Sequence, residues 1–325
     1  MHILITGAAG MIGAKLAAAL TTRGTLRGRE VDGLTLVDVG TPVPPEGVSG
    51  AALSADLSDP AAAPALIEAR PDVIFHLAAI VSGEAEADTA KGYAVNLKGM
   101  LSLCEAIAAQ EDYAPRVVFA SSIAVFGTPL PDVIGDDVPP RPLTSYGTQK
   151  RMGELLIDDM SRKGLMDGVS LRLPTISVRP GKPNAAASGF WSSILREPLA
   201  GQPATLPVPA DTVHWLASPR SAVGFFLHAA EMDTGPLGQD RSLNLPGLAA
   251  TPAELIAALG RVAGPEAAAR VTERPDAAIA AISAGWPRAF APDRAAALGF
   301  EAERDVDALL AAYVEDELGG ALPRD

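Results

Sequence analysis

Residues 2–13 read HILITGAAGMIG, and this stretch decides the fold. The run HILIT predicts a short buried strand, and the pattern that follows predicts a helix over residues 11–23. Gly7 permits a tight exit from the strand, Gly10 lets the backbone approach a pyrophosphate, and Gly13 lets the helix pack closely. The free N–H groups at the helix start, beside Met11 and Ile12, would then face the phosphates of a dinucleotide.

Apolar runs and helical patterns alternate through the first half of the chain. This alternation predicts an α/β protein with a Rossmann-type doubly wound parallel sheet. Further strands are expected over residues 34–38, 73–77, 116–120 and 169–173, and helices over residues 60–69, 89–110 and 145–163.

The composition of the sequence changes after Pro174, where Pro and Gly become frequent and most of the later segments show helical patterns. We expect residues 1–173 to form an NAD-binding domain to which residues 216–248 return. The remaining parts, residues 174–215 and 249–325, are expected to form a smaller, mostly helical lobe that binds substrate. Thr251-Pro-Ala-Glu254 reads as a capping box at the start of one of its helices.

Composition limits the function of the chain. Its 325 residues are 48% apolar with a formal net charge of −13, a balance that repels phosphate backbones and argues against nucleic-acid binding. The single cysteine excludes an intramolecular disulfide, and four histidines offer few metal ligands, so we expect no metal site. Without a basic leader or a long apolar run, we expect a cytoplasmic protein with no membrane segment.

Asp38 closes the second predicted strand. A carboxylate there can accept hydrogen bonds from both hydroxyls of an adenosine ribose, and it repels a 2′-phosphate. The sequence therefore favours NAD over NADP. Asp56 and Leu57 either contact the adenine edge or form an ordinary loop.

Tyr146 and Lys150 lie four residues apart in YGTQK, one turn apart on a helix. A nearby ammonium stabilises a phenolate, so Lys150 is expected to lower the pKa of the Tyr146 phenol. The strand before this helix ends in SSIAVFG, residues 121–127, whose hydroxyls could bind a substrate oxygen. Glycine turn, serine and Tyr–Lys pair together predict an oxidoreductase site.

These motifs resemble the extended short-chain dehydrogenase/reductases, the NAD-dependent epimerase/dehydratase family. The resemblance covers the whole chain and is most specific over residues 3–183. It implies Ser122 as the catalytic hydroxyl, Tyr146 as the acid/base, Lys150 as its tuner, and Asn96 as support for a proton relay. It also implies three groups of cofactor contacts. These are the site residues Asn96, Tyr146 and Lys150, the HLAA residues Leu77, Ala78 and Ala79, and the turn after the strand over residues 169–173, with Pro174, Thr175 and Ile176.

Departures from the family pattern bear on the substrate. Ile123-Ala124 replaces the Asp-Glu pair of the dehydratases, and residues 212–221 lack the pattern of nucleotide-sugar epimerases. Residues 76–86, 143–150 and 172–190 are similar to D-erythronate dehydrogenases, which implies oxidation of C2 of a short sugar acid with NAD. The alternatives are a UDP-hexose type 4-epimerase with tightly bound NAD and a non-catalytic NAD sensor, against which the intact Ser–Tyr–Lys set argues.

A small carboxylate substrate needs a cation or a cluster of donors, because an unpaired buried anion is costly. The candidate substrate residues are Ser82, Ser122, Tyr146, Arg179, Lys182, Asn184, His214 and Arg220. By family resemblance, two apolar helices, over residues 89–110 and 146–163, are expected to form a homodimer. The predicted partners are thus a sugar acid and a second copy of the chain.

Overall fold

The computed structural model describes residues 1–47, 49–181 and 187–322. It divides the chain into two compact units, each made of three stretches. Unit 1 holds residues 1–125, 142–173 and 223–244, and unit 2 holds residues 126–141, 174–222 and 245–325. The expected division placed residues 126–141, 216–222 and 245–248 with the first part; the structure groups all three with unit 2.

Unit 1 is built on a seven-stranded sheet with the order β13-β9-β7-β6-β1-β4-β5, and every neighbouring pair in it is parallel. The chain builds outward from β1 through β4 to β5, then crosses to β6 on the other side of β1 and continues outward. This reversal between β1 and β6 is where doubly wound sheets bind ligands, at the carboxyl ends of the strands. The strands are β1 (His2–Thr6), β4 (Gly33–Asp38), β5 (Gly50–Ser54), β6 (Val73–His76), β7 (Arg116–Ser122), β9 (Asp167–Leu173) and β13 (Ser242–Asn244).

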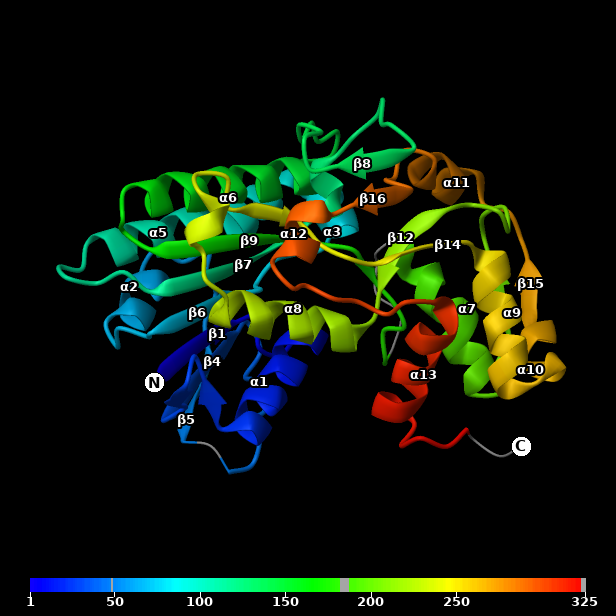
Figure 1. Ribbon diagram of the computed structural model, residues 1–325, viewed down its shortest axis with the longest axis horizontal. Helices are drawn as coiled ribbons and strands as arrows, with labels where there is room; N and C mark the ends of the chain where they lie inside the picture. The colour runs from blue at the N-terminus through cyan, green and yellow to red at the C-terminus, as the bar shows by residue number, and fades with distance from the viewer. Residues whose placement is uncertain (48, 182–186, 323–325) are drawn as a thin grey trace. The chain divides into compact units, whose positions relative to one another are not determined.

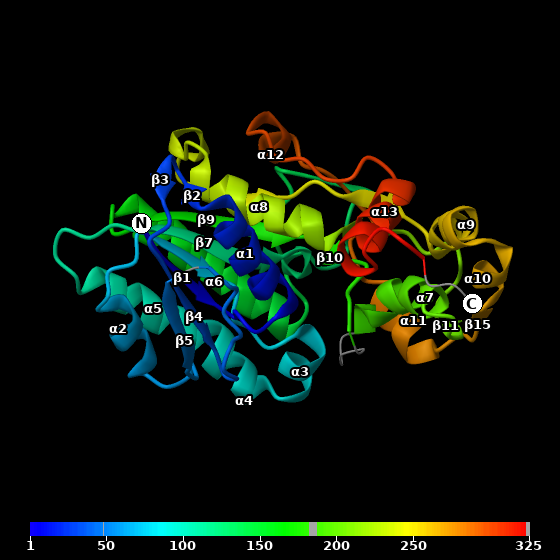
Figure 2. The ribbon, with the colours of Figure 1, turned by 90° about the horizontal axis from the view of Figure 1, so that it is seen from below.

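Helices cover both faces of this sheet (Figure 1 and Figure 2). Because side chains alternate along a strand, Leu4, Ile74 and Val117 pack into one cluster with α2, α5 and α6. Phe75 points to the opposite face, where its ring meets Phe226 of α8 edge to face at 6.3 Å. The covering helices are α1 (Met11–Arg23), α2 (Ala62–Ile67), α5 (Gly99–Ala108), α6 (Ser145–Arg162) and α8 (Pro219–Glu231).

One sequence prediction needs correction in unit 1, and four of its elements were not predicted. The helix expected over residues 89–110 is three segments, α4 (Thr89–Gly92), a π-helical turn over Tyr93–Lys98 and α5. Strand β5 was not predicted, since most of its residues are exposed at the sheet edge and carry little apolar signal. The short pair β2 (Thr25–Leu26) and β3 (Arg29–Glu30) and helix α3 (Ser82–Ala87) were also missed.

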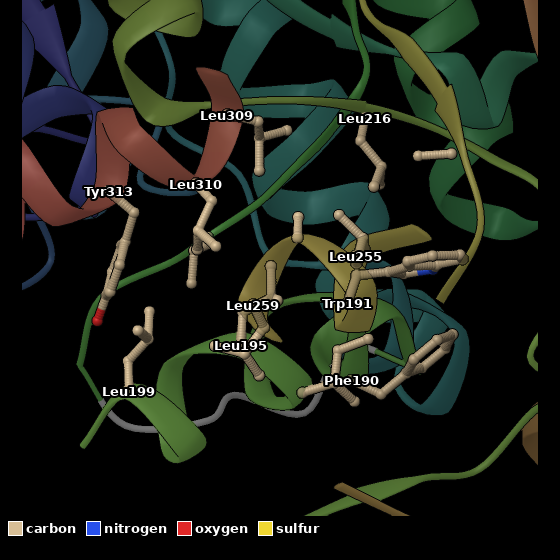
Figure 3. Packing of buried hydrophobic residues seen from close by; sticks show 14 of the residues in the cluster. Phe190, Trp191, Leu195, Leu199, Leu216, Leu255, Leu259, Leu309, Leu310 and Tyr313 are labelled. Atoms are coloured by element: carbon tan, nitrogen blue, oxygen red, sulfur yellow. The ribbon is translucent and has the colours of Figure 1, made fainter. Parts of the chain in front are cut away.

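Unit 2 has a core of its own (Figure 3). Trp191, Leu195 and Leu199 of α7 (Phe190–Leu199) pack with α9 (Pro252–Ala263) and α13 (Val306–Glu317) in one buried cluster. The predicted capping box of α9 is confirmed, with Thr251 and Glu254 each accepting the other's backbone N–H. The shorter helices are α10 (Pro265–Ala269), α11 (Ala277–Ser283) and α12 (Asp293–Ala297).

Small sheets complete unit 2, and the sequence did not predict them. One sheet has three strands in the order β10-β12-β14, and two further pairs are β11–β15 and β16–β8. The strands are β8 (Val133–Gly135), β10 (Thr175–Ile176), β11 (Ala204–Leu206), β12 (His214–Ala217), β14 (Leu248–Ala250), β15 (Val271–Glu273) and β16 (Ala289–Ala291). Among the described residues, no helix is both long and apolar enough to span a membrane.

Candidate active site

The glycine turn between β1 and α1 leaves room only for glycine at two positions. Gly7 has a φ of +75°, and a Cβ there would lie 2.7 Å from the nitrogen of Ala78, in the segment that follows the neighbouring strand β6. A Cβ on Gly13 would lie 2.3 Å from the Gly7 oxygen. Gly10 is the N-cap of α1 and has no side chain to cap the first turn. The turn therefore offers the bare backbone and helix start that a pyrophosphate requires.

Asp38 lies at the end of β4, beside that turn. Its two carboxylate oxygens accept the backbone N–H groups of Ala9, at 3.0 Å, and of Val39, at 2.7 Å. These two bonds fix the carboxylate at the carboxyl edge of the sheet while leaving its remaining lone pairs open. Charge and position both fit a ribose diol.

A cavity of about 190 Å³ lies within unit 1 at the carboxyl ends of β6, β7 and β9. Of the predicted site residues, the cavity brings together Ile12, Leu77, Ala79, Tyr146 and Lys150. Ser121, which the sequence indicated together with Ser122, also lines the cavity. The lining residues that sequence reasoning missed are Ile80, Val81, Ala120, Leu173 and Phe226. Leu173 and Ala120 end predicted strands, so their place at the carboxyl edge of the sheet could have indicated that they line the site. No feature of the sequence indicated Phe226.

Tyr146 and Ser122 form a hydroxyl pair beside the cavity. Helix α6 begins after Thr144, whose side chain accepts the N–H of Gly147, and this cap places Tyr146 in the first turn. A Cβ on Gly147 would lie 2.1 Å from the Ala124 oxygen, so the helix start packs directly on the segment that follows Ser122. The Ser122 hydroxyl accepts the N–H of Ala124 at 3.1 Å and is hydrogen-bonded with the Tyr146 phenol.

Lys150 follows one turn later and is buried. Its ammonium donates to the Ala120 carbonyl at 2.7 Å, and its nitrogen lies 4.8 Å from the Phe119 ring centre and 5.7 Å from the Tyr146 ring centre. Burial lowers the pKa of Lys150 to about 7, because desolvation disfavours the charged amine.

The pKa of the Tyr146 phenol is raised overall in this structure, and its lowering by Lys150 stays a prediction. Burial raises the pKa of Tyr146 to about 12, and the hydrogen bond with Ser122 opposes that rise only in part. The sequence shows the i, i+4 spacing but not the depth at which both side chains lie. Desolvation therefore outweighs the attraction that the spacing suggested.

Asn96 lies in the π-helical turn, with its side chain buried. Its amide accepts the N–H of Ile80 at 2.9 Å, donates to the Ile80 carbonyl at 3.3 Å, and donates to the Gln149 side chain at 2.8 Å. The side chain thus ties the cavity wall at Ile80 to the helix that carries Tyr146 and Lys150. These hydrogen bonds anchor the Asn96 side chain, and its support of a proton relay stays a prediction.

The structure also shows where the remaining predicted cofactor and substrate residues lie. Leu57 is buried against Gly99 of α5, and exposed Asp56 accepts the N–H of Ser58, a hydrogen bond that lowers its pKa. Ser82 is exposed at the start of α3. Pro174, Thr175 and Ile176 belong to unit 2.

Two of the candidate substrate cations already have partners in unit 2. Arg220 donates to Glu315 and Asp316 at 2.6–3.1 Å. His214 is buried between Thr175, 2.7 Å from Nε2, and the Pro287 carbonyl, 3.0 Å from Nδ1, and burial lowers its pKa to about 4. A neutral His214 with Nδ1 protonated satisfies both contacts, so it positions Thr175 instead of supplying charge.

Arg179 also lies in unit 2, where its backbone N–H donates to Ser192 and its guanidinium to Ser188. Burial and the neighbouring Arg196 lower the pKa of Arg179. It stays a predicted carboxylate ligand. Lys182 and Asn184 lie outside the described residues. Within the described residues there is no group of three His, Cys, Asp or Glu that could hold a metal ion.

The comparisons with known proteins place the chain in a family. Residues 3–214 match the model of the NAD dependent epimerase/dehydratase family. The chain belongs to this family, as its motifs predicted.

Relatives of known name are similar over nearly their whole length. A D-erythronate dehydrogenase of Cupriavidus necator is 48% identical over 97% of this chain and 98% of its own. A second D-erythronate dehydrogenase, of Haemophilus influenzae, is 39% identical over 98% of this chain and 100% of its own. A solved structure described as a nucleoside-diphosphate-sugar epimerase from Agrobacterium tumefaciens is 54% identical, with a TM-score of 0.97 over 99% of this chain and 96% of that one.

Proposed function

We propose that this protein is an NAD-dependent dehydrogenase that oxidises the C2 hydroxyl of D-erythronate to 2-dehydro-D-erythronate. The observation that carries the proposal is the pair Tyr146 and Lys150, which lines the cavity of unit 1, with Ser122 hydrogen-bonded to Tyr146 and a glycine turn beside them. Full-length similarity to two D-erythronate dehydrogenases supports this substrate.

The residues of unit 1 fit NAD. The turn at Gly7, Gly10 and Gly13 would hold the pyrophosphate, Asp38 the adenosine ribose, and Lys150 the nicotinamide ribose. When bound, NAD supplies the oxidised nicotinamide that accepts a hydride from the substrate carbon.

Side chains of the protein accept the proton that the substrate hydroxyl loses. In its phenolate form, having first given up its own proton, the Tyr146 oxygen takes the proton of the C2 hydroxyl, and Ser122 orients the substrate oxygen by a hydrogen bond. Since burial raises the pKa of Tyr146 to about 12, a phenolate here needs compensating positive charge. The protonated Lys150, 5.7 Å from the ring centre, is placed to supply it.

The direct test is an assay of the purified protein with NAD and D-erythronate, followed by absorbance of NADH. We expect steady net production of NADH. Absence of turnover across a panel of four- to six-carbon aldonates would refute the proposal.

The second candidate function is nucleotide-sugar epimerisation, favoured by the description of the 54% identical solved structure as a nucleoside-diphosphate-sugar epimerase. An epimerase returns the hydride to its substrate, so it interconverts UDP-sugars without net NADH. Incubation with UDP-hexoses, analysed by chromatography, distinguishes the two. We expect no interconversion.

Replacing Asp38 by Ala is expected to weaken the preference for NAD. The variant loses charge-assisted hydrogen bonds to the ribose, each worth about 1.5–3 kcal/mol, so kcat/KM for NAD should fall by roughly 10-fold or more. The value for NADP should rise relative to that for NAD, because the repulsion of a 2′-phosphate is removed. Asp59→Ala, which removes a carboxylate that accepts the N–H of Ala61, is the control. Equal losses in both variants would contradict the role of Asp38.

We also propose that the protein forms a homodimer through α5 and α6. Leu101 and Leu155 are 40% and 50% exposed on these two helices. Leu155→Glu is expected to shift the molar mass measured by light scattering towards that of one chain. An unchanged mass in Leu155→Glu and in Leu101→Glu would reject this interface.

A further inference from the structure

Glu154 is a fully buried carboxylate one turn beyond Lys150 on α6. One oxygen accepts the Ser121 hydroxyl at 2.6 Å and Nε of Arg172 at 2.9 Å. The other accepts the second nitrogen of Arg172 at 3.1 Å and the guanidinium of Arg151 at 2.8 Å. All four bonds are made within unit 1. A buried carboxylate satisfied in this way holds its partners in one geometry.

The partners of Glu154 lie at the strand ends that form the site. Ser121 of β7 and Arg172 of β9 are paired in the sheet register, directly before Ser122 and Leu173. Arg172 in turn donates to Asn244 of β13 at 3.2 Å. One carboxylate therefore joins α6, which carries Tyr146 and Lys150, to the strands that carry the catalytic hydroxyl and the cavity wall.

The same carboxylate lies one helical turn from Lys150 on α6, and its negative charge favours the ammonium form of Lys150. The titratable groups that interact with Lys150 are His76 of β6 and, on its own helix, Tyr146 and Glu154. Arg172 of β9 is ion-paired with Glu154. His76 is neutral, because burial and Lys150 lower its pKa to about 3. Tyr146 is neutral near pH 7 as well. Of the two buried cations, Arg172 is ion-paired with Glu154, while Lys150 interacts with the charge of Glu154 from one helical turn away; the third cation, Arg151, is 26% exposed.

We propose that Glu154 is a positioning residue that keeps Lys150 in its ammonium form and fixes the ends of β7 and β9 at the site, with Arg172 limiting the negative charge that Lys150 experiences. The inference rests on the proposed function for its role in turnover. Its electrostatic part concerns Lys150 alone, so it is testable without substrate. Glu154 acts through Lys150 and Ser121, and it touches neither the reacting carbon nor the cofactor.

The electrostatic test is an NMR titration of the lysine side chains in the cofactor-free full chain, with the Lys150 signal assigned by its loss in Lys150→Met. Burial lowers the pKa of Lys150 to about 7, and the charge of Glu154 opposes that shift. Glu154→Gln should therefore move the Lys150 midpoint down by about 1 pH unit or more. Arg172→Gln removes a cation and leaves Glu154 in place, so it should move the midpoint up.

The two variants are expected to shift the Lys150 midpoint in opposite directions, and this difference separates the proposal from a purely structural role of Glu154. Loss of packing alone would shift both variants in one direction, or neither. Glu154→Asp keeps the charge and should keep a midpoint near that of the unmodified protein. The double variant Glu154→Gln, Arg172→Gln removes both charges together and should lie between the two single variants. It also supplies a folded comparison if Glu154→Gln alone loses its thermal transition.

The activity test follows the alkaline limb of kcat/KM for the sugar acid. If Lys150 must be protonated, this limb moves to lower pH in Glu154→Gln and to higher pH in Arg172→Gln. Midpoints that move together, or an unchanged midpoint in folded Glu154→Gln, would overturn the proposal. If no sugar acid is turned over, the proposed substrate fails, while the lysine titration still decides the role of Glu154.

Discussion

Replacing Tyr146 by Phe is expected to lower kcat for sugar-acid oxidation by about 10²- to 10⁴-fold, the range lost when a positioned acid/base is removed. The substitution deletes one oxygen from a partly buried ring and leaves the cap of α6, the Lys150–Ala120 bond and the glycine turn in place. NAD affinity, measured by calorimetry, should therefore change little. The rate is measured as NADH absorbance under saturating substrate.

The matched control is Tyr113→Phe. Tyr113 also carries a partly buried hydroxyl, which donates to the Pro71 carbonyl at 2.7 Å, at the opposite ends of the strands from the cavity. Each variant loses one hydrogen bond, worth about 1 kcal/mol of stability. Only Tyr146→Phe should lose turnover. A Tyr146→Phe enzyme that keeps most of its rate would remove Tyr146 from the chemistry.

Replacing Gly13 by Ala is expected to destabilise the protein and to abolish measurable NAD binding. The new Cβ would lie 2.3 Å from the Gly7 oxygen and 2.7 Å from the Ala8 Cα, both backbone atoms, so α1 must move away from β1. Overpacking of this kind costs about 1–3 kcal/mol. Because the shift displaces the helix start that faces the pyrophosphate, the loss of affinity should exceed the loss of stability. Thermal unfolding and calorimetric titration with NAD measure the two effects.

Two other glycines serve as controls for Gly13→Ala. Gly10→Ala meets only the Gly7 oxygen, at 3.2 Å, so it should unfold near the temperature of the unmodified protein while losing NAD affinity. Gly224 is exposed on α8, with nothing within 4 Å of a new Cβ. Gly224→Ala should raise stability by about 0.5–1 kcal/mol through helix propensity and leave NAD binding unchanged. Unimpaired NAD binding in Gly13→Ala would contradict the close-packing argument.

The sequence predicted the central strands because they are buried on both faces and therefore read as unbroken apolar runs. The exposed edge strand β5, GAALS, had no such signal. The π-helical turn around Asn96 was also missed, because its residues are as suited to an α-helix as to a wider turn. In unit 2, strands of two to four residues are too short to show alternation.

The candidate site was predictable where its residues are close in the chain. Tyr146 and Lys150 share a helix, and Ser122 ends a recognisable strand. The protonation of these groups was not predictable, since it depends on burial against residues such as Phe119 and His76, far away in sequence. The ion pairs of Arg220 were unpredictable for the same reason, because the carboxylates of Glu315 and Asp316 follow about 95 residues later in the chain.

Unit 2 is assembled from three separate stretches of chain, residues 126–141, 174–222 and 245–325, which pair with one another in strands such as β8 with β16. A chimaera that borrows only one stretch from a relative would break these pairings. Exchange of unit 2 between relatives by recombination therefore requires all three stretches to be transferred together, whereas single substitutions within one stretch leave the strand pairings intact.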